Sequence, residues 1–404
     1  MEIWRIWLEI CAVLLEIYGL YSGILMVFAL FPRKKYPQKD PKTRFAVVIA
    51  ARDEAPVIGD TVRRLLRQTY PGELYDIYVV PNNCTDDTAG VADRAGATIL
   101  HCTEPVRDKG GALRCAFRQL ESLGYDAYCV FDADNQVFPD FLARMNDAFL
   151  SGARIAKGIH RASNPTDSYL AGCYDLYFEN FHLMFSRPRA WLGLSAKLMG
   201  TGFAVSRELL QEMGGFNTKT LTEDTEFAVL CAMHGERIWY VPDAITLDEQ
   251  PNDFKTSTIQ RRRWSSGVIT TLRTYWWELM RSCFKRGRWL FSLDMLMMLM
   301  GPIMQFVGVF PALNLVIGAV VHGQWLALGI GLASFWGGMS AMALVLTILG
   351  KRKLRGMVKA ILLYPWFLLT WYPISVLSVI YPARIWRPIA HGQRKKDKHF
   401  HPAA

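Results

Sequence analysis

Long apolar runs stand at both ends of the chain, and the stretch between them mixes apolar with polar residues. The first run, residues 7–31, is long enough for a membrane-spanning helix, which needs about 20 residues, although Glu9 and Glu16 interrupt it. It lacks the positive start and the cleavage site of a signal peptide, so we predict a retained anchor. Three further runs follow at 290–321, 325–349 and 360–382.

Clusters of Lys and Arg lie beside these runs. One cluster follows the first run at residues 33–35, and another separates the third and fourth runs at residues 351–355. Loops rich in Lys and Arg face the cytoplasm. Both loops and the polar middle region are therefore predicted to be cytoplasmic, in an integral protein of the cell membrane.

The basic tail fits this scheme less well. Three late crossings would place residues 394–399 outside, against the charge rule. Pro365 and Pro373 interrupt the last run, and residues 288–302 could lie along the membrane surface. Either exception changes the number of crossings, so the side of the tail stays open.

The middle region alternates apolar runs of strand length with segments of helical spacing. Residues 44–51 form a run typical of a buried strand, and the next segment places Val62 and Leu65 on one face of a helix. Strands that alternate with helices predict a mostly parallel α/β sheet, whose ligands bind at the carboxyl ends of the strands. The other predicted strands are 75–80, 97–100 and 127–131, and the predicted helices are 56–69, 85–96 and 110–124.

Three of the predicted strands end in polar residues. In the segment FDAD, Asp132 and Asp134 follow a buried strand two positions apart. Two carboxylates at this spacing can share a hard cation such as Mg²⁺ or Mn²⁺, which commonly joins carboxylates to substrate phosphates. An ordinary turn explains the same pair. The other strand ends carry Arg52, Asp53, Glu54, Asn82 and Asn83.

Composition narrows the partners. The formal net charge of +10 is compatible with nucleic-acid binding, but the basic residues cluster beside apolar runs and no nucleic-acid recognition module is present. Anionic membrane lipid is therefore the predicted partner, and no nucleic acid. The 8 Cys residues are scattered singly and the 8 His residues form no metal motif, which predicts reduced thiols and no zinc site.

A series of segments between residues 44 and 264 resembles the membrane-bound family 2 glycosyltransferases, which include cellulose, chitin, hyaluronan and poly-N-acetylglucosamine synthases. The segments are VVIAARDEA, NNCTDDT, DKGGAL, FDAD, GTGFAV, TEDTEF and QRRRW. The resemblance implies a GT-A-type, mostly parallel α/β domain inserted between transmembrane helices. The implied divisions are an anchor and linker at 1–42, a cytoplasmic transferase domain with interfacial helices at 43–285, transmembrane helices at 286–390 and a basic tail at 391–404.

The resemblance implies catalytic residues in the TED segment. Glu223 and Asp224 match the motif, and Asp224 takes the position of the general base. The same letters also describe a helix N-terminus with Thr222 as its cap and acidic residues favoured by the helix dipole. Both interpretations can hold together.

The resemblance places the acceptor between the GTG and QxxRW segments. Thr201, Gly202 and Trp264 lie where the family holds the acceptor sugar. Arg261 and Arg262 fall between the motif positions, and we interpret them as a basic anchor close to the membrane.

The donor site implied by the resemblance is a nucleotide-sugar site. Asp132 and Asp134 would hold the diphosphate and its metal, Mg²⁺ or Mn²⁺. Asn82 departs from the family, which often has an acidic residue there, so the selectivity for uracil stays open. The implied donor-binding residues are Asp53, Glu54, Asn82, Lys109, Asp132, Asp134, Gln260 and Arg263.

These residues suffice for an inverting transfer. The acceptor alcohol must lose its proton as it bonds to the anomeric carbon, and a positioned base such as Asp224 typically contributes about 10²–10⁴-fold. The leaving diphosphate needs positive charge, which a metal ion and Arg263 would supply. One displacement inverts the anomeric centre, so an α-linked donor gives a β-linkage.

Three functions are considered, and the first is the predicted one, because the resemblance associates the QxxRW segment with processive members of the family. The first is a processive enzyme that polymerises a β-linked polysaccharide from a UDP-sugar of glucose or N-acetylglucosamine type and passes it through its own helices. Trp264 would hold the growing end, and Gln305, Asn314 and residues 334–340 could line the route. The second is a non-processive enzyme that adds one sugar to a membrane lipid. The third, an inactive scaffold, disagrees with the intact acidic set.

Two aromatic segments leave alternatives open. Residues 168–193 could form a membrane-facing amphipathic segment, a wall of the acceptor site, or a core helix. Residues 268–280 are similarly interfacial in character.

Overall fold

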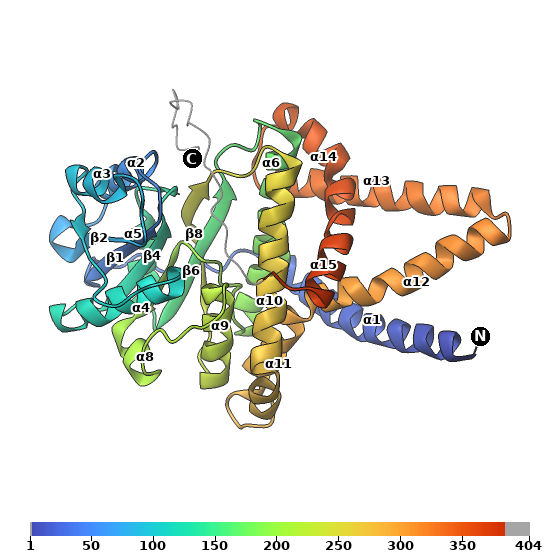
Figure 1. Ribbon diagram of the computed structural model, residues 1–404, viewed down its shortest axis with the longest axis horizontal. Helices are drawn as coiled ribbons and strands as arrows, with labels where there is room; N and C mark the ends of the chain where they lie inside the picture. The colour runs from blue at the N-terminus through green and yellow to red at the C-terminus, as the bar shows by residue number, and fades with distance from the viewer. Residues whose placement is uncertain (1, 384–404) are drawn as a thin grey trace.

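The sheet lies at one end of the molecule, and long apolar helices project from the other end (Figure 1). A computed structural model describes residues 2–383 of the chain. Its strands are β1 Phe45–Ala51, β2 Tyr75–Pro81, β3 Thr98–Ile99, β4 Ala127–Asp132, β5 Gln136–Val137, β6 Ile155–Ala162, β7 Phe203–Ser206 and β8 Trp239–Asp248.

Helices cover the sheet and connect it to the apolar end. Those of the α/β domain are α2 Ile58–Leu65, α3 Thr88–Arg94, α4 Lys109–Leu120, α5 Phe141–Phe149, α6 Tyr169–Asn180, α7 Arg187–Leu192, α8 Arg207–Glu212, α9 Glu223–His234 and α10 Phe254–Ser282. Those of the apolar end are α1 Glu2–Ala29, α11 Trp289–Leu299, α12 Gly301–Val321, α13 Trp325–Leu349, α14 Leu354–Leu369 and α15 Trp371–Ile380. Short turns of 3₁₀ helix, Gly72–Leu74 and Glu121–Leu123, and of π helix, Phe181–Ser186, complete the set.

The described strands form one sheet in the order β3-β2-β1-β4-β7-β6-β8-β5. β1 to β4 are parallel, β7 is antiparallel to both of its neighbours, and β6 is parallel to β8. Because two antiparallel steps separate β4 from β6, these two strands point the same way. The carboxyl ends of β1, β2, β4, β6 and β8 therefore share one edge of the sheet, which is where ligands bind in open α/β sheets.

The predicted mostly parallel α/β fold is confirmed. β1 reads as an unbroken apolar run because both of its faces are covered: Val48 joins the core on one side of the sheet, and Val47 joins the core on the other. Several predicted elements are shorter than expected. The strand at 97–100 shrinks to Thr98–Ile99, the helix at 56–69 shrinks to α2, and the helix at 85–96 shrinks to α3.

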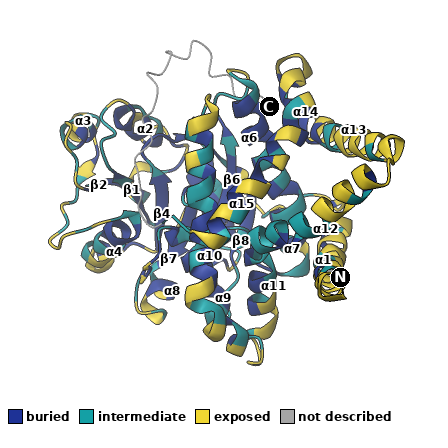
Figure 2. Ribbon diagram, turned by 45° about the vertical axis from the view of Figure 1, so that its right-hand side comes forward, coloured by how far each residue is buried: buried dark blue, intermediate teal, exposed yellow. Residues whose placement is uncertain are grey.

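Four apolar segments among the described residues are long enough to cross a membrane: α1, α12, α13 and the α14–α15 pair. In α12 and α13 the exposed positions carry apolar side chains such as Leu315 and Leu326, which fits contact with lipid (Figure 2). The α14–α15 pair differs, because it packs on α6 and α10 and lies alongside α10 instead of extending with α1, α12 and α13 (Figure 1).

The last apolar run is interrupted between its two prolines. Pro365 lies inside α14, and the break falls at Thr370. Pro373 has no N–H to donate to the carbonyl of Leu369 and its ring crowds that carbonyl, so the helix ends there. At the break, the hydroxyl of Thr370 donates to the carbonyl of Phe367 at 2.6 Å.

Both loops that carry the predicted positive clusters contact the α/β domain. Arg352, between α13 and α14, makes a bidentate ion pair with Asp175 of α6 at 2.6 and 2.7 Å. The linker after α1 is fastened by Tyr36, whose hydroxyl donates to the carbonyl of Tyr240 at 3.0 Å. The two loops therefore lie at the end of the apolar helices that faces the α/β domain. The basic tail at 391–404 lies outside the described residues.

Candidate active site

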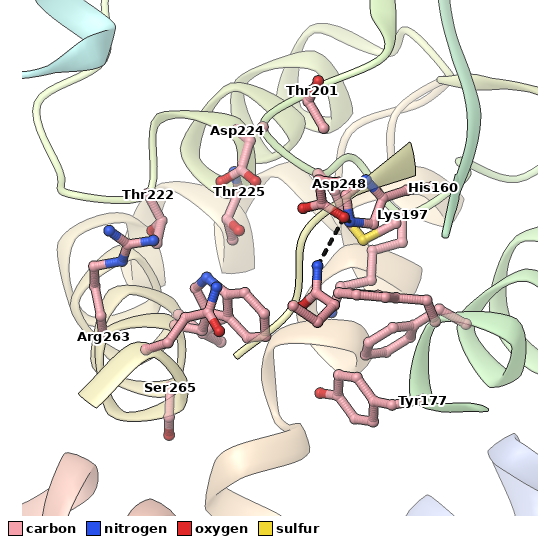
Figure 3. Close-up of a pocket in the computed structure, with 18 of the residues that line it drawn as sticks. His160, Tyr177, Lys197, Thr201, Thr222, Asp224, Thr225, Asp248, Arg263 and Ser265 are labelled. Atoms are coloured by element: carbon pink, nitrogen blue, oxygen red, sulfur yellow. Dashed lines mark hydrogen bonds and ion pairs between the residues drawn. The ribbon is translucent and has the colours of Figure 1, made fainter. Parts of the chain in front are cut away.

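One cavity of about 1510 Å³ runs along the carboxyl edge of the sheet and continues between the apolar helices. Its sheet end is formed by residues that follow β1, β2 and β4, including Asp53, Asn82 and Asp134. Its helix end is formed by α1, α12, α14 and α15. The TED and QxxRW residues stand between the two ends, where Figure 3 shows Asp224 and Arg263 among the lining side chains.

The loop after β1 is held in a tight left-handed turn. Asp53 has a φ of 56°, and its carboxylate accepts hydrogen bonds from the backbone N–H of Thr85 at 2.6 Å and from its hydroxyl at 3.0 Å. These bonds lower the pKa of Asp53. Asp53, Glu54 and Asn82 all line the sheet end. Asp53 thus joins the loops after β1 and β2 into one rim.

Lys109 connects the FDAD and TED segments. It begins α4, where Asp108 caps the helix, and its ammonium contacts the carboxylate of Asp132 directly. The same ammonium donates to the carbonyl of Gly200 at 2.5 Å and lies 3.6 Å from Glu223. Burial alone would lower the pKa of Lys109, but the carboxylates outweigh burial and raise it. Lys109 therefore remains a fixed positive charge at the sheet end.

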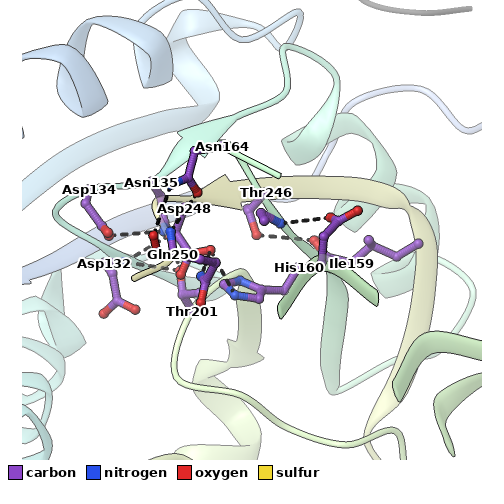
Figure 4. A network of polar contacts seen from close by, with 12 residues as sticks. Asp132, Asp134, Asn135, Ile159, His160, Asn164, Thr201, Thr246, Asp248 and Gln250 are labelled. Atoms are coloured by element: carbon purple, nitrogen blue, oxygen red, sulfur yellow. Dashed lines mark hydrogen bonds and ion pairs between the residues drawn. The ribbon is translucent and has the colours of Figure 1, made fainter. Parts of the chain in front are cut away.

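The turn that carries the FDAD carboxylates is held by hydrogen bonds from its backbone. The backbone N–H of Asp132 donates to the side chains of Asn135 and Thr201, both at 3.1 Å, and these two side chains contact each other (Figure 4). Thr201 lines the cavity, but its hydroxyl also supports the β4 turn. Asp132 and Asp134 line the cavity as well. Two carboxylates facing one cavity are hard oxygen ligands that fit Mg²⁺ or Mn²⁺.

The TED carboxylates occupy the first turn of α9 and line the cavity. Burial raises the pKa of Glu223 to about 7, with a further contribution from the neighbouring Asp224. Burial also raises the pKa of Asp224, against hydrogen bonding by the backbone N–H of Thr225 at 2.6 Å. Lys109 and the helix N-terminus oppose these shifts. Raised carboxylate pKa values in a cavity are typical of proton-transfer sites.

Thr222 does not cap α9 as predicted. It occupies the N-cap position, but its hydroxyl makes no cap hydrogen bond and lies 3.4 Å from the hydroxyl of Thr271 in α10. Glu226 instead turns back and accepts from the backbone N–H groups of Lys219 and Thr220, at 2.8 and 2.6 Å. The start of α9 is thus packed on α10, which draws the TED and QxxRW segments together.

Gly267 allows this close packing. A Cβ atom at Gly267 would lie 2.1 Å from Cγ2 of Thr222, a separation that real side chains do not reach. The glycine stands in the middle of α10, where it costs helix stability relative to alanine. Its position is explained by the contact with α9.

The predicted QxxRW residues share one face of α10. Gln260, Arg263 and Trp264 all line the cavity. Burial lowers the pKa of Arg263, and the carboxylates of Glu223 and Asp132 oppose the shift. The ring of Trp264 packs edge-on against Tyr174 at 6.0 Å. The structure therefore brings the acidic and the basic-aromatic segments to one site, as the sequence predicts.

Arg261 was predicted to be a basic anchor close to the membrane, and the structure shows which groups it contacts there. Its side chain is fully buried and donates to the hydroxyl of Thr370 at 2.6 Å and weakly to the carbonyl of Phe367 at 3.4 Å. Its guanidinium also lies 4.7 Å from the ring centre of Phe367. Arg261 thus binds α10 to the break between α14 and α15. Arg262 donates to the carbonyl of Tyr381 in an exposed position.

Of the two GTG glycines, only Gly200 lines the cavity. Gly200 lines the cavity, and a Cβ atom there would lie 3.2 Å from the ammonium of Lys109. Gly202 is not among the lining residues. Its φ of 61° favours glycine, and a Cβ atom there would lie 3.0 Å from the hydroxyl of Thr246. Of the predicted acceptor residues, Thr201 and Trp264 line the cavity and Gly202 does not.

Sequence reasoning missed a polar cluster at the ends of β6 and β8. His160 contacts Asp248 at 3.1 Å, and the side-chain amide of Gln250 donates to the same carboxylate at 2.7 Å (Figure 4). All three line the cavity. No motif marks them, and the strands that carry them become neighbours only through the sheet topology.

Two lysines were also missed, one buried, Lys157, and one partly buried, Lys197. Burial lowers the pKa of Lys157 to about 7 and that of Lys197 to about 8. Lys157 donates to the carbonyl of Gly158 at 2.9 Å, and Lys197 lies 4.2 Å from the ring centre of Phe181. Lys197 lines the cavity and is attracted by Asp224.

The aromatic segment at 168–193 is both a core element and a wall. Most of α6 is buried, which fits a core helix, while Tyr177, Phe178 and Phe181 line the cavity. Of the groups predicted to line a polymer route, only Gln305 is among the lining residues. Asn314 instead accepts from the indole N–H of Trp4 at 3.1 Å.

Comparison with known proteins gives a consistent family. A family model described as "Glycosyltransferase like family 2" matches residues 41–267. The "Probable glycosyltransferase YdaM" of Bacillus subtilis is 31% identical over 237 residues, which cover 55% of this chain and 55% of the relative. A "Beta-monoglucosyldiacylglycerol synthase" of Synechocystis is 26% identical over 249 residues, which cover 58% of this chain and 50% of the relative. The chain spans about half the length of these curated relatives.

Among solved structures, the mannosyltransferase PcManGT from Pyrobaculum calidifontis, in complex with GDP-Man and Mn²⁺, has a similar fold. The TM-score is 0.65, and the match covers 93% of this chain and 99% of that chain. The sequence identity is 18%, so the likeness concerns the fold.

Proposed function

Because the chain belongs to the glycosyltransferase-like family 2, we propose that it transfers a sugar from a nucleotide-sugar donor to a lipid acceptor of the membrane. The relatives named above include an enzyme that by its name makes a glycosylated diacylglycerol. Among the two leading functions predicted from the sequence, the geometry supports this one better.

The observation that carries the proposal is the cavity's change of character along its length. Beyond Trp264 the lining becomes apolar, through residues such as Leu15, Met304 and Leu368. Gln305, Tyr364 and Trp371 bring polar atoms to this lining, and the oxygen of Gln305 accepts from the hydroxyl of Ser375 at 2.5 Å. An apolar chamber that opens from a charged site into membrane helices suits a lipid whose head group reacts at the sheet end.

The donor is proposed to lie along the sheet end. Asp53, Glu54 and Asn82 would contact the nucleoside, and Lys109 and Arg263 would face the diphosphate. A Mg²⁺ or Mn²⁺ ion, when bound by Asp132 and Asp134, supplies further positive charge against the diphosphate. The PcManGT complex, whose fold is similar, holds Mn²⁺ together with GDP-Man.

Asp224 is the proposed base. It lies in the cavity beside Glu223, whose pKa of about 7 is raised mainly by burial, so that one of these two neighbouring acids readily holds a proton and the other accepts one. Deprotonation of the acceptor hydroxyl by Asp224 and departure of the diphosphate together give an inverted, β-linked product from an α-linked donor.

A processive polysaccharide synthase is the second candidate, and Trp264 favours it. Its ring lies on the cavity wall beside Phe178, at 6.2 Å between ring centres, where it could stack on an acceptor sugar. Against this candidate, α12 and α13 expose apolar side chains on most of their length, and of their polar side chains only that of Gln305 lines the cavity.

The transferase domain, residues 43–285, is proposed to be cytoplasmic because both positive loops contact its side of the membrane helices. A cysteine or tag between Pro37 and Thr43, or near Lys353, should stay shielded from an impermeant reagent in intact cells. A tag at Gly323, between α12 and α13, should react. Labelling of either shielded position would contradict the orientation.

Product analysis tests the function. The full chain in lipid nanodiscs is given radiolabelled UDP- and GDP-sugars, and the product is partitioned between organic solvent and water. We expect one labelled sugar on an organic-soluble lipid. Long β-linked chains at any donor concentration would contradict the proposed lipid glycosyltransferase. If Trp264→Ala shortened these chains, the result would support the processive synthase.

A further inference from the structure

A polar cluster on the cavity wall is not used by the proposed transfer. His160, Asp248 and Gln250 stand at the carboxyl ends of β6 and β8, beyond the FDAD carboxylates along the same edge of the sheet. Asp248 accepts from Gln250 at 2.7 Å and contacts His160 at 3.1 Å (Figure 4).

Two atoms of the cluster lack a hydrogen-bond partner among the described residues. They are the side-chain oxygen of Gln250, which is 2% exposed, and Nδ1 of His160, which is 5% exposed. A buried polar atom without a partner costs free energy and is rare in folded proteins. Both side chains line the cavity, and a small rotation of either one would bring its unpartnered atom to a hydroxyl group of a bound ligand.

Hydrogen bonds to the backbone hold Gln250 and His160 in place. The side chain of Asn164 accepts from the backbone N–H of Gln250 at 2.9 Å and donates to its carbonyl at 3.0 Å. The backbone of His160 is fixed by His182, and its ring meets Phe178 edge-on at 4.5 Å. Such preorganisation lowers the entropic cost of binding a ligand.

The charge around the cluster selects the kind of ligand. Glu249 and Asp253 line the cavity next to Asp248, and these carboxylates oppose an anionic group such as a phosphate. Lys197 is a cation on the same wall, but it is attracted by Asp224 and lies over Phe181. Carboxylate and amide oxygens accept hydrogen bonds, so the fitting ligand is neutral and donates several.

The position of the cluster assigns it to the acceptor. Through Phe178, His160 is linked to Trp264, and these aromatic rings lead toward the helix end of the cavity. The residues expected to hold the nucleotide stand instead at β1, β2 and β4.

We propose that His160, Asp248 and Gln250 form a subsite for neighbouring hydroxyl groups of a neutral acceptor, such as the sugar head group of a glycolipid. The inference deepens the proposed function and rests on it for the source of the hydroxyls. A free saccharide offers the same chemistry without the lipid, so the experiment includes both.

The experiment measures binding and transfer separately. Monoglucosyl-dioleoylglycerol, cellobiose and undecaprenyl phosphate are titrated against the full chain with UDP present, and each is then supplied as acceptor with a panel of sugar nucleotides. Gln250→Met removes the unpartnered oxygen, and Asn164 still holds the backbone. Asp248→Asn removes the charge, and Gln211→Met, an exposed glutamine of α8, is the matched control.

We expect Gln250→Met and Asp248→Asn to weaken binding of the hydroxylated acceptor by about tenfold, the loss typical of one or two hydrogen bonds. The KM for the donor should stay within about twofold, since the nucleotide contacts are untouched. Thermal unfolding of each variant shows whether the fold is kept. Gln211→Met should behave as the wild type.

The outcomes separate the two proposals. Binding of cellobiose in place of the glycolipid, with the same loss in the variants, would keep the subsite and remove the lipid acceptor. Transfer to undecaprenyl phosphate alone would keep the lipid acceptor and overturn the subsite. Binding of neither hydroxylated compound, or a loss confined to the donor KM, would also overturn the subsite.

Discussion

The sheet end and the helix end of the cavity differ in the charge that their lining side chains carry. At the sheet end, Lys109 is shared by Asp132 and Glu223, and charges are concentrated where a ligand can replace one partner. At the helix end most lining side chains are apolar, Gln305 is already bonded to Ser375, and Tyr364 and Trp371 add one hydroxyl and one indole N–H. The contrast supports the proposal of a charged donor on one side and an acceptor with an apolar body on the other.

The largest effect should come from the base. Asp224→Asn keeps the shape of the side chain but cannot accept the acceptor proton, so turnover should fall by about 10²–10⁴-fold while the donor still binds. Donor affinity and turnover are measured side by side, with Asp243→Asn, an exposed position of β8, as control. Turnover within a few-fold of wild type would remove Asp224 from this role.

The next effect tests the sheet end. Asp134→Ala removes one hard ligand and leaves the diphosphate charge less compensated, so metal-dependent UDP binding should weaken by at least about tenfold. Calorimetric titration of UDP at several Mn²⁺ concentrations measures this, with the exposed Asp93→Ala as control. An unchanged metal dependence would mean that FDAD is a structural turn.

The helix end is tested by filling it. Gly308 lines the cavity, and a Cβ atom there would be 3.8 Å from Tyr372 and 3.9 Å from Leu15, so a larger side chain would project into the chamber. Gly308→Phe should raise the acceptor KM several-fold without changing donor hydrolysis. Gly318→Phe, in the same helix with no atom within 4 Å of its Cβ position, is the matched control. Equal effects of both changes would show that the helix end of the cavity does not bind the acceptor.

The smallest effect concerns pH. The pKa of Glu223 is raised from 4.5 to about 7 in the folded protein. In that window the folded protein holds a proton that the unfolded chain has released, so the contribution to stability is complete below pH 4.5 and is lost as pH rises through about 7. Urea unfolding of the ligand-free protein should show a smaller loss of stability from about pH 5 to about pH 8 in Glu223→Gln than in wild type. Identical slopes would contradict the shift.

The sheet end could be predicted from the sequence because its residues follow short, strongly apolar strands. Parallel strands bring their carboxyl ends together whatever their exact register, so Asp53, Asn82 and Asp132 were placed at one edge. The TED and QxxRW segments were placed by family resemblance, and their meeting depends on one helix contact.

The rest depends on contacts between distant segments. His160 and Asp248 meet because β6 and β8 pair across an irregular register, which no local pattern records. Arginine is usually found at the protein surface, so no pattern in the sequence indicates that Arg261 is buried. Its buried partner is the hydroxyl of Thr370, at the break between α14 and α15. Threonine is a common N-cap residue, but the hydroxyl of Thr222 contacts Thr271 of α10 instead of capping α9.

The contact between Gly267 and Thr222 has a consequence for how the chain can change over time. The separation of the acidic and basic-aromatic motifs is set by the absence of a single carbon atom, since any side chain at 267 would collide with Thr222. A relative with alanine at this place would need a smaller residue at 222 to keep the same spacing. These two positions, far apart in the sequence, should therefore vary together among family members.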